Sequence, residues 1–177
     1  RNAQDGLSLH SQGNVLLTNI QTAFNDTNRG DFQYFSGVAV NYGKPENILN
    51  LTIGGTNYLA NNTLYGLVAQ TDGLVNIAGL TLDTNGNTSG GSGMYLESEG
   101  IGKTVLLTNV TAVNNYLNGA HILSQGAVTV KGSRFVANTN SGLWVRTNGN
   151  ALTLQSNYFM RNTLYGVYVN DTPSLFT

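Results

Sequence analysis

The chain has 177 residues, a formal net charge of −1 and no cysteine. Only 10% of the residues are charged, so the electrostatic attraction on which binding to nucleic-acid phosphates depends is missing. The lack of cysteine excludes disulfides and thiolate metal sites, and no apolar run approaches the roughly 20 residues of a membrane span. We therefore expect no nucleic-acid partner, no membrane span and a single domain over residues 1–177.

Three residue types dominate the composition. The chain contains 25 Asn, 22 Gly and 20 Thr but only two Pro. Glycine and asparagine tolerate the positive φ of tight corners, and threonine favours strands. This composition, with an ordinary apolar share of 40%, predicts many short strands joined by many turns.

A glycine followed by alternating apolar residues recurs seven times in chain order. The phrases are GLSL from Gly6, GVAV from Gly37, GLVA from Gly66, GMYL from Gly93, GAHI from Gly119, GLWV from Gly142 and GVYV from Gly166. Successive glycines are 31, 29, 27, 26, 23 and 24 residues apart. The alternation predicts a short strand with one buried face after each glycine.

Two more short segments follow each of the first six of these strands. The second segment again alternates, with inward pairs at Val15 and Leu17, Leu51 and Ile53, Val75 and Ile77, Val105 and Leu107, Val128 and Val130, and Leu152 and Leu154. The third segment ends in asparagine, most clearly at residues 135–138 and 159–162. An asparagine stands four residues before the next glycine at Asn62, Asn115, Asn138 and Asn162, with Asn25 and Asn85 as equivalents before longer loops.

Three short strands in every 23–31 residues describe one turn of a solenoid. Propeller blades need about 40 residues, and the leucine-dominated consensus of leucine-rich repeats is absent. We therefore predict an all-β parallel β-helix of six to seven coils. Strands of successive coils would then lie about 4.8 Å apart.

The pattern Phe-x-x-Asn-x-x-x-Gly-Φ-x-Φ, where Φ is apolar, occurs at residues 135–145 and 159–169. It resembles the right-handed parallel β-helix repeat of pectate-lyase-like proteins. The phrases NVLLTNI, TVLLTNVTAVNN and AVTVKGSRFVANTNSG are also similar to repetitive bacterial surface and secreted β-helix proteins. The resemblance implies an extracellular location and the role of an adhesin, stalk or filament element. The same coil also carries lyases, hydrolases and epimerases, so the likeness specifies the fold more than the function.

Neither end of the chain resembles a polar capping segment. Uncapped solenoid ends expose strand edges that can pair with another chain. We therefore expect a segment of a longer repeat protein, or end-to-end association of copies.

The four asparagines Asn62, Asn115, Asn138 and Asn162 are expected to form an inward ladder. Each amide would bond the amides of the coils above and below, as stacked amides do in cross-β structures. We expect a structural role for this asparagine ladder rather than a ligand-binding one.

Positions two and four after each glycine are expected to point outward. Position two reads Ser8, Ala39, Val68, Tyr95, His121, Trp144 and Tyr168, and position four reads His10, Asn41, Gln70, Glu97, Leu123, Arg146 and Asn170. We call Tyr95, His121, Trp144 and Tyr168 the aromatic strip. With Glu97, Arg146 and Asn170 beside it, the strip could stack sugar rings and bond their hydroxyls, or contact a surface protein. The alternative is cross-strand stacking that only stabilises the sheet.

Acidic residues form a second candidate site. Asp72 and Glu99 follow their glycines by six residues in adjacent coils, which predicts a separation of about 5 Å, and Glu97 precedes Glu99 by two residues. Such a pair suits a retaining glycosidase, and carboxylate oxygens equally suit Ca²⁺. The basic residues Lys103, Lys131, Arg134 and Arg161 are scattered over different coils, so we favour a non-catalytic protein without a cofactor. The alternatives are a polysaccharide lyase, hydrolase or epimerase acting on acidic glycans, and a calcium site at Asp72 and Glu99.

Overall fold

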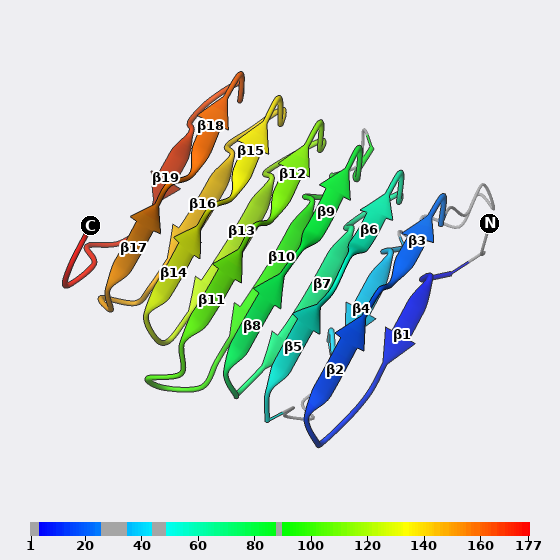
Figure 1. Cartoon of the computed structure of the whole chain (residues 1–177), viewed down its shortest axis with the longest axis horizontal. Coiled ribbons are helices and arrows are strands. Elements are labelled where there is room, and N and C mark those ends of the chain that lie inside the picture. The colour runs from blue at the N-terminus through cyan, green and yellow to red at the C-terminus, as the bar shows by residue number, and fades with distance from the viewer. Residues whose placement is uncertain (1–3, 26–34, 44–48, 88–89) are drawn as a thin grey trace.

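The computed structural model describes residues 4–25, 35–43, 49–87 and 90–177. Within these ranges the chain forms 19 strands and no helix, arranged in parallel sheets of seven, six and six strands. Hydrogen-bonded neighbours in each sheet are every third strand of the sequence, so each coil contributes one strand to each sheet (Figure 1). The described chain therefore winds through six three-strand coils and begins a seventh at its last strand. This confirms the predicted all-β parallel β-helix.

The three sheets are named here by the order in which the chain enters them. Sheet A contains β1 (Leu7–Leu9), β4 (Val38–Val40), β7 (Leu67–Thr71), β10 (Met94–Ser98), β13 (Ala120–Ser124), β16 (Leu143–Arg146) and β19 (Val167–Val169). Sheet B contains β2 (Val15–Thr18), β5 (Leu51–Gly54), β8 (Val75–Ala78), β11 (Val105–Thr108), β14 (Val128–Lys131) and β17 (Leu152–Gln155). Sheet C contains β3 (Gln21–Ala23), β6 (Asn57–Ala60), β9 (Leu80–Asp83), β12 (Thr111–Val113), β15 (Arg134–Val136) and β18 (Tyr158–Met160).

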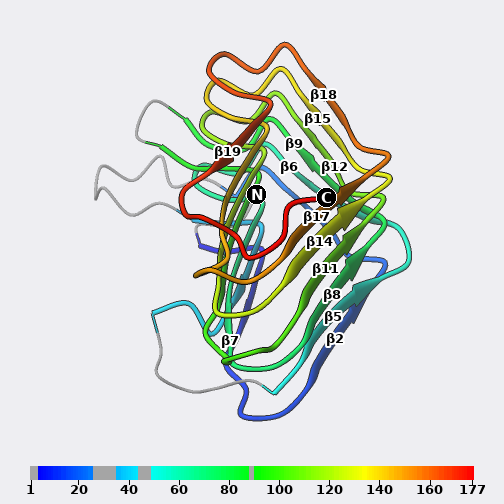
Figure 2. The same ribbon diagram turned by 90° about the vertical axis from the view of Figure 1, so that its left-hand side faces the viewer.

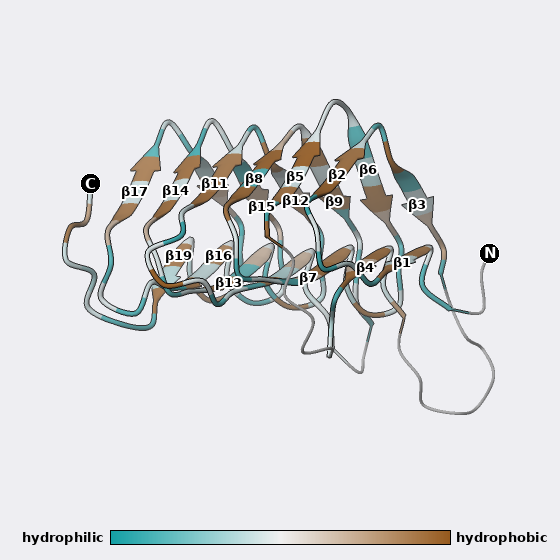
Figure 3. Cartoon of the chain, turned by 90° about the horizontal axis from the view of Figure 1, so that it is seen from below, coloured by the Kyte–Doolittle hydropathy of each residue, from teal (hydrophilic) through white to brown (hydrophobic). Residues whose placement is uncertain are grey.

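The core is a continuous apolar column inside the coils. Viewed along the axis, successive coils superpose into one three-sided outline (Figure 2), and hydropathy is highest on the strands and lowest at the turns (Figure 3). The inward positions of sheet A are buried in the central coils, as at Met94 and Leu96 of β10. Phe135 is fully buried and stacks on Phe159 of the next coil, with ring centroids 5.2 Å apart. No coil buries this surface alone, so stacking holds the fold together.

The asparagine ladder extends over six coils, because Asn25 and Asn85 join the four predicted members. Each of the first five side-chain amides donates to the side-chain oxygen of the next asparagine along the column, over 2.7–3.1 Å. In Asn115 the oxygen accepts from the backbone and side chain of Asn85, while Nδ2 donates to Leu82 O and to Asn138 Oδ1. The structure thus confirms the predicted hydrogen bonding between stacked asparagines.

Backbone strain recurs at the corner before each ladder asparagine. The residue preceding it has a positive φ between 53° and 56° in all six coils: Phe24, Asn61, Thr84, Asn114, Ala137 and Arg161. A second left-handed column lies between sheets B and C, at Asn19, Gly55, Gly79, Asn109, Gly132 and Ser156. The abundance of asparagine and glycine is explained in part by these two columns, since both residues adopt this conformation readily.

Two outward residues of sheet A are buried rather than exposed, and this corrects the sequence-based expectation. Ala39 is 8% and Val68 1% exposed. Val68 is the register neighbour of Tyr95, and the rings of Tyr42, Tyr65 and Tyr95 gather at this end of the sheet. Alternation in the sequence indicates the direction of a side chain but not what lies over it.

Asn41 also departs from its expected outward position. It follows the end of β4, has a φ of 51° and is fully buried. Its side chain accepts a hydrogen bond from Ser11 N and donates one to Ser11 O. In this coil, position four is therefore a corner residue that bonds the coil before it.

Candidate functional site

The outer face of sheet A carries the four rings of the aromatic strip in a single column. Tyr95 pairs in register with His121, His121 with Trp144, and Trp144 with Tyr168. Consecutive ring centroids are 5.0, 4.1 and 6.0 Å apart. All four side chains are half-buried. The chain's single tryptophan thus lies outside the core and between two other rings.

His121 is held as a neutral ring at the centre of the strip. Its imidazole lies between Tyr95 and Trp144, and its Nε2 is buried without a hydrogen-bond partner in the described residues. Burial lowers the pKa of His121 to about 4, with Glu97 opposing and Arg146 adding to the shift. Near neutral pH the strip therefore has no charge at this position.

Three further tyrosines widen the strip, and the sequence-based search did not include them. Tyr42 and Tyr65 contact Tyr95 with centroid distances of 6.3 and 5.5 Å, and Tyr165 contacts Tyr168 at 5.3 Å. The sequence does contain a sign of two of them, because Tyr65 and Tyr165 occupy the same position in a repeated phrase, Asn-Thr-Leu-Tyr-Gly. We call Tyr42, Tyr65 and Tyr165 the flanking tyrosines.

Two tyrosines of the strip bond the residue two positions along their own strand. The Tyr95 hydroxyl donates to Glu97 Oε1 over 2.6 Å, and the Tyr168 hydroxyl donates to Asn170 Oδ1 over 3.4 Å. Burial and the Glu97 carboxylate raise the pKa of Tyr95, so its hydroxyl stays protonated and acts as the donor. These bonds orient both rings and join the aromatic column to a polar edge.

That polar edge contains a hollow, which we call the corner pocket. Its lining combines carboxylates, a guanidinium and uncharged polar groups: Glu97, Ser98, Glu99, Leu123, Ser124, Gln125 and Arg146. Glu97, Leu123 and Arg146 are register neighbours from three successive strands of sheet A. The structure therefore brings predicted residues Glu97 and Arg146 to one pocket beside the strip, and Asn170 to the next coil along the same edge.

The acids Asp72 and Glu99 lie at stacked corners of adjacent coils. Glu99 N donates to Thr71 O over 2.8 Å. The two corners are also close at the next residue, because a Cβ added to Gly100 would lie only 1.8 Å from Asp72 O. Their pairing as a catalytic or calcium site stays a prediction. Among the described residues, no group of three or more His, Cys, Asp or Glu is placed to hold a metal ion.

The repeat was then compared with known proteins. A family model described as the right-handed beta helix region matches residues 56–176, about two thirds of the chain. The chain belongs to the right-handed β-helix family. No curated protein and no solved structure matches the chain. The family thus gives the handedness of the coil, which is the hand that parallel strand connections adopt in nearly all proteins.

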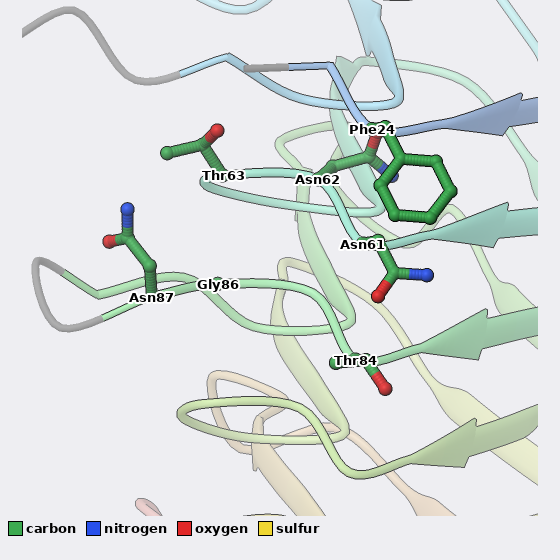
Figure 4. A pocket seen from close by; sticks show the side chains of 7 residues that line it. All are labelled: Phe24, Asn61, Asn62, Thr63, Thr84, Gly86 and Asn87. Carbon is green, nitrogen blue, oxygen red and sulfur yellow. The ribbon is translucent and has the colours of Figure 1, made fainter. Parts of the chain in front are cut away.

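A second hollow of this right-handed β-helix lies where the corners after β3, β6 and β9 meet (Figure 4). It is lined by one half-exposed ring and by small or amide-bearing residues: Phe24, Asn61, Asn62, Thr63, Thr84, Gly86 and Asn87. The Asn62 amide bonds the ladder, and the Thr63 and Thr84 hydroxyls donate to Asn25 O and Asp83 Oδ1. These groups already bond the protein, so this hollow offers a ligand less than the corner pocket does.

The fold of this right-handed β-helix contains only strands and turns in its described parts. No helix there has the length and apolar character needed to cross a membrane.

Proposed function

We propose that this chain is a non-catalytic segment of a bacterial surface or secreted protein, and that it binds a glycan through the aromatic strip. One observation carries the proposal: four rings stack in register across four coils, remain half open to solvent and border a polar pocket. Such a surface would suit an adhesin, a stalk or a filament element. The β-helix would supply the rigid support.

The chemistry of a sugar matches this surface. A pyranose ring has apolar C–H faces that stack on aromatic rings, and hydroxyls around its rim that need hydrogen-bond partners. The strip offers the rings, and Glu97, Arg146 and Asn170 offer acceptors and donors along one edge. Aromatic side chains give large contact areas at interfaces while keeping a polar end available.

The partial exposure of the strip favours binding over a purely structural stack. Cross-strand aromatic pairs stabilise a sheet by about 0.2–1 kcal/mol each, and that gain does not require any part of a ring to stay open. Here the rings remain half-buried, and Tyr42 and Tyr165 at the two ends are 46% and 52% exposed. A contiguous open aromatic surface of this kind commonly marks an interaction site.

A glycan array tests the proposal. The unmodified chain should bind a defined set of glycans, and Trp144→Ala should weaken that binding at least about tenfold, because it removes the central ring. Tyr158→Ala, which removes a half-exposed ring from sheet C, is the matched control and should leave binding unchanged. Equal thermal unfolding of the two variants would exclude misfolding as the cause. Binding that survives Trp144→Ala, or no binding to any glycan, would overturn the proposal.

A further inference from the structure

We propose that the strip takes an uncharged linear glycan that lies along the β-helix axis, with hydroxyls held by Glu97 and Arg146. The inference rests on the proposed function and names the substrate class of the same site. It follows from three features: the direction of the ring column, the bonding capacity left in the corner pocket, and the charge around that pocket.

The ring column sets the direction of the ligand. The rings succeed one another from coil to coil, so the column crosses the strands of sheet A rather than following one of them. Neighbouring strands are about 4.8 Å apart, so four rings span about 14 Å. One coil advances by about the length of one sugar residue in an extended chain. A linear glycan of at least four residues can therefore place one ring over each coil.

The corner pocket leaves bonding capacity beside that path. Glu97 accepts the Tyr95 hydroxyl at Oε1, and no bond to its Oε2 is formed by the described residues. The Arg146 side chain is exposed, and it forms no hydrogen bond or ion pair with any residue that the structure describes. A free carboxylate oxygen accepts from sugar hydroxyls, and a guanidinium offers five donors in a fixed plane.

Glu97 and Arg146 do not neutralise each other. Leu123 lies between them in register, so their backbones are two strand spacings, about 10 Å, apart. Two separated groups of opposite charge can bond hydroxyls on successive sugars, with the apolar Leu123 between the two contact points. A single ionic group on the ligand would satisfy only one of them.

The charge at this edge disfavours an acidic glycan. Carboxylates of Asp72, Glu97, Glu99 and Asp171 stand at the sheet A corners, where Asp171 Oδ2 accepts from Thr147 N and Gly149 N. Among the described residues at this edge, only Arg146 and Lys103 offset them, and the Lys103 side chain lies against Gly100. Each carboxylate of a polyuronate would meet this net negative edge, whereas a neutral glycan would not. The geometry therefore points to an uncharged glycan.

Matched oligosaccharides test the inference. Trp144 is the only tryptophan among nine tyrosines, so fluorescence excited at a wavelength that tyrosine does not absorb reports the strip alone. The chain should be titrated with β-1,4-linked glucose and mannose hexamers and with the corresponding glucuronate and mannuronate hexamers, at about 20 and 150 mM salt. We expect saturable binding of at least one neutral hexamer with little salt dependence. Its uronate should bind at least tenfold more weakly, and more weakly still at low salt.

Two variants locate the hydroxyl contact. Glu97→Gln should weaken binding of the neutral hexamer about tenfold, because charge-assisted hydrogen bonds are lost, and should strengthen binding of the uronate. Asp83→Asn makes the same charge change on β9 of sheet C, away from the strip, and should leave binding of the neutral hexamer unaffected.

The possible outcomes separate this inference from the proposed function. Tighter binding of a uronate, no response to either neutral hexamer, or a Glu97→Gln variant with unchanged neutral affinity would each overturn the inference. Tighter binding of a uronate would leave the glycan-binding proposal standing. If the chain bound no glycan on the array, both the proposed function and this inference would be overturned.

Discussion

The side chain of Asn138 shows at the scale of one residue why the coils stay in register. Its oxygen accepts from the backbone and side chain of Asn115, and its Nδ2 donates to Ala112 O and Asn162 Oδ1. All four hydrogen bonds of one amide are thus formed in a fully buried place. An amide that is fully bonded inside the protein stabilises it, whereas the same site left partly bonded is costly.

Removing this amide should therefore destabilise the chain strongly. Asn138→Ala removes the acceptor of two buried donors of Asn115 and one hydrogen bond to Ala112 O, and each unsatisfied buried donor costs about 1–3 kcal/mol. We expect a loss of at least about 3 kcal/mol in the free energy of unfolding, measured by urea denaturation. Asn76→Ala, which removes an exposed outward amide of β8, should change stability by less than about 0.5 kcal/mol. Equal effects of the two substitutions would contradict the role of the ladder.

The buried imidazole of His121 predicts a pH dependence. Its folded pKa of about 4 lies below the ordinary value of 6.5, so between these values the unfolded chain binds a proton that the folded chain does not. The stability contribution is therefore complete above pH 6.5 and is lost as pH falls toward 4. His121→Phe keeps a ring in the strip but cannot titrate.

Unfolding curves between pH 7 and 4.5 measure this effect. The unmodified chain should lose more stability on acidification than His121→Phe, whereas a His10→Gln variant at an exposed site should behave like the unmodified chain. Parallel pH profiles for the unmodified chain and His121→Phe would show that His121 is not held neutral.

The sequence predicted part of this residue-scale chemistry. The asparagine ladder followed from spacing alone, because a four-residue offset from the strand glycine recurs in coil after coil. The protonation state of His121 could not be predicted from the sequence, because its pKa depends on burial by rings of the neighbouring coils and on the charges of Glu97 and Arg146. Electrostatic environment is a property of the assembled surface.

At the scale of the element, the glycine that precedes each sheet A strand sets the spacing between coils. A Cβ on Gly119 would lie 2.6 Å from Gly142 O of the next coil and 2.9 Å from Asn138 Nδ2. The first contact is with backbone, which cannot rotate away. Glycine is therefore required here by close approach and not by an unusual φ.

Gly119→Ala should separate two coils and destabilise the protein by about 2 kcal/mol or more, in the range of overpacked cores. Gly54→Ala is the matched control inside a strand, because no atom lies within 4 Å of its added Cβ. It should be neutral or stabilising by up to about 1 kcal/mol, since alanine loses less backbone entropy than glycine on folding. Calorimetric melting of both variants measures the difference. A tolerated Gly119→Ala would show that the coils are not packed as closely as described.

Element positions followed from the sequence more fully than their surroundings did. The period-2 alternation identified the strands of sheets A and B and their register, because a one-residue slip would turn every apolar side chain outward. The flanking tyrosines and the burial of Val68 were missed. These depend on corner conformations and on rings from other coils, which a repeat pattern does not encode.

At the scale of the whole molecule, stacking converts a sequence repeat into a straight surface. Residues 23–26 positions apart in the chain, from Tyr95 to Tyr168, become register neighbours in one column on sheet A, whose strands β10, β13, β16 and β19 follow one another along the axis (Figure 1). Each coil contacts mainly the coils beside it, as in other solenoids. A rigid rod of this kind can present a long, regular binding face that no single coil could form.

The most direct test of glycan binding along this face is a nitrogen-15 NMR titration with a neutral β-1,4-linked hexamer. A single tryptophan gives a single indole N–H signal, which reports Trp144. We predict that this signal and the backbone signals of β10, β13, β16 and β19 shift together and saturate, while those of sheets B and C stay unchanged. An indole signal that does not move at saturating ligand, or shifts confined to the corners after β3, β6 and β9, would contradict it.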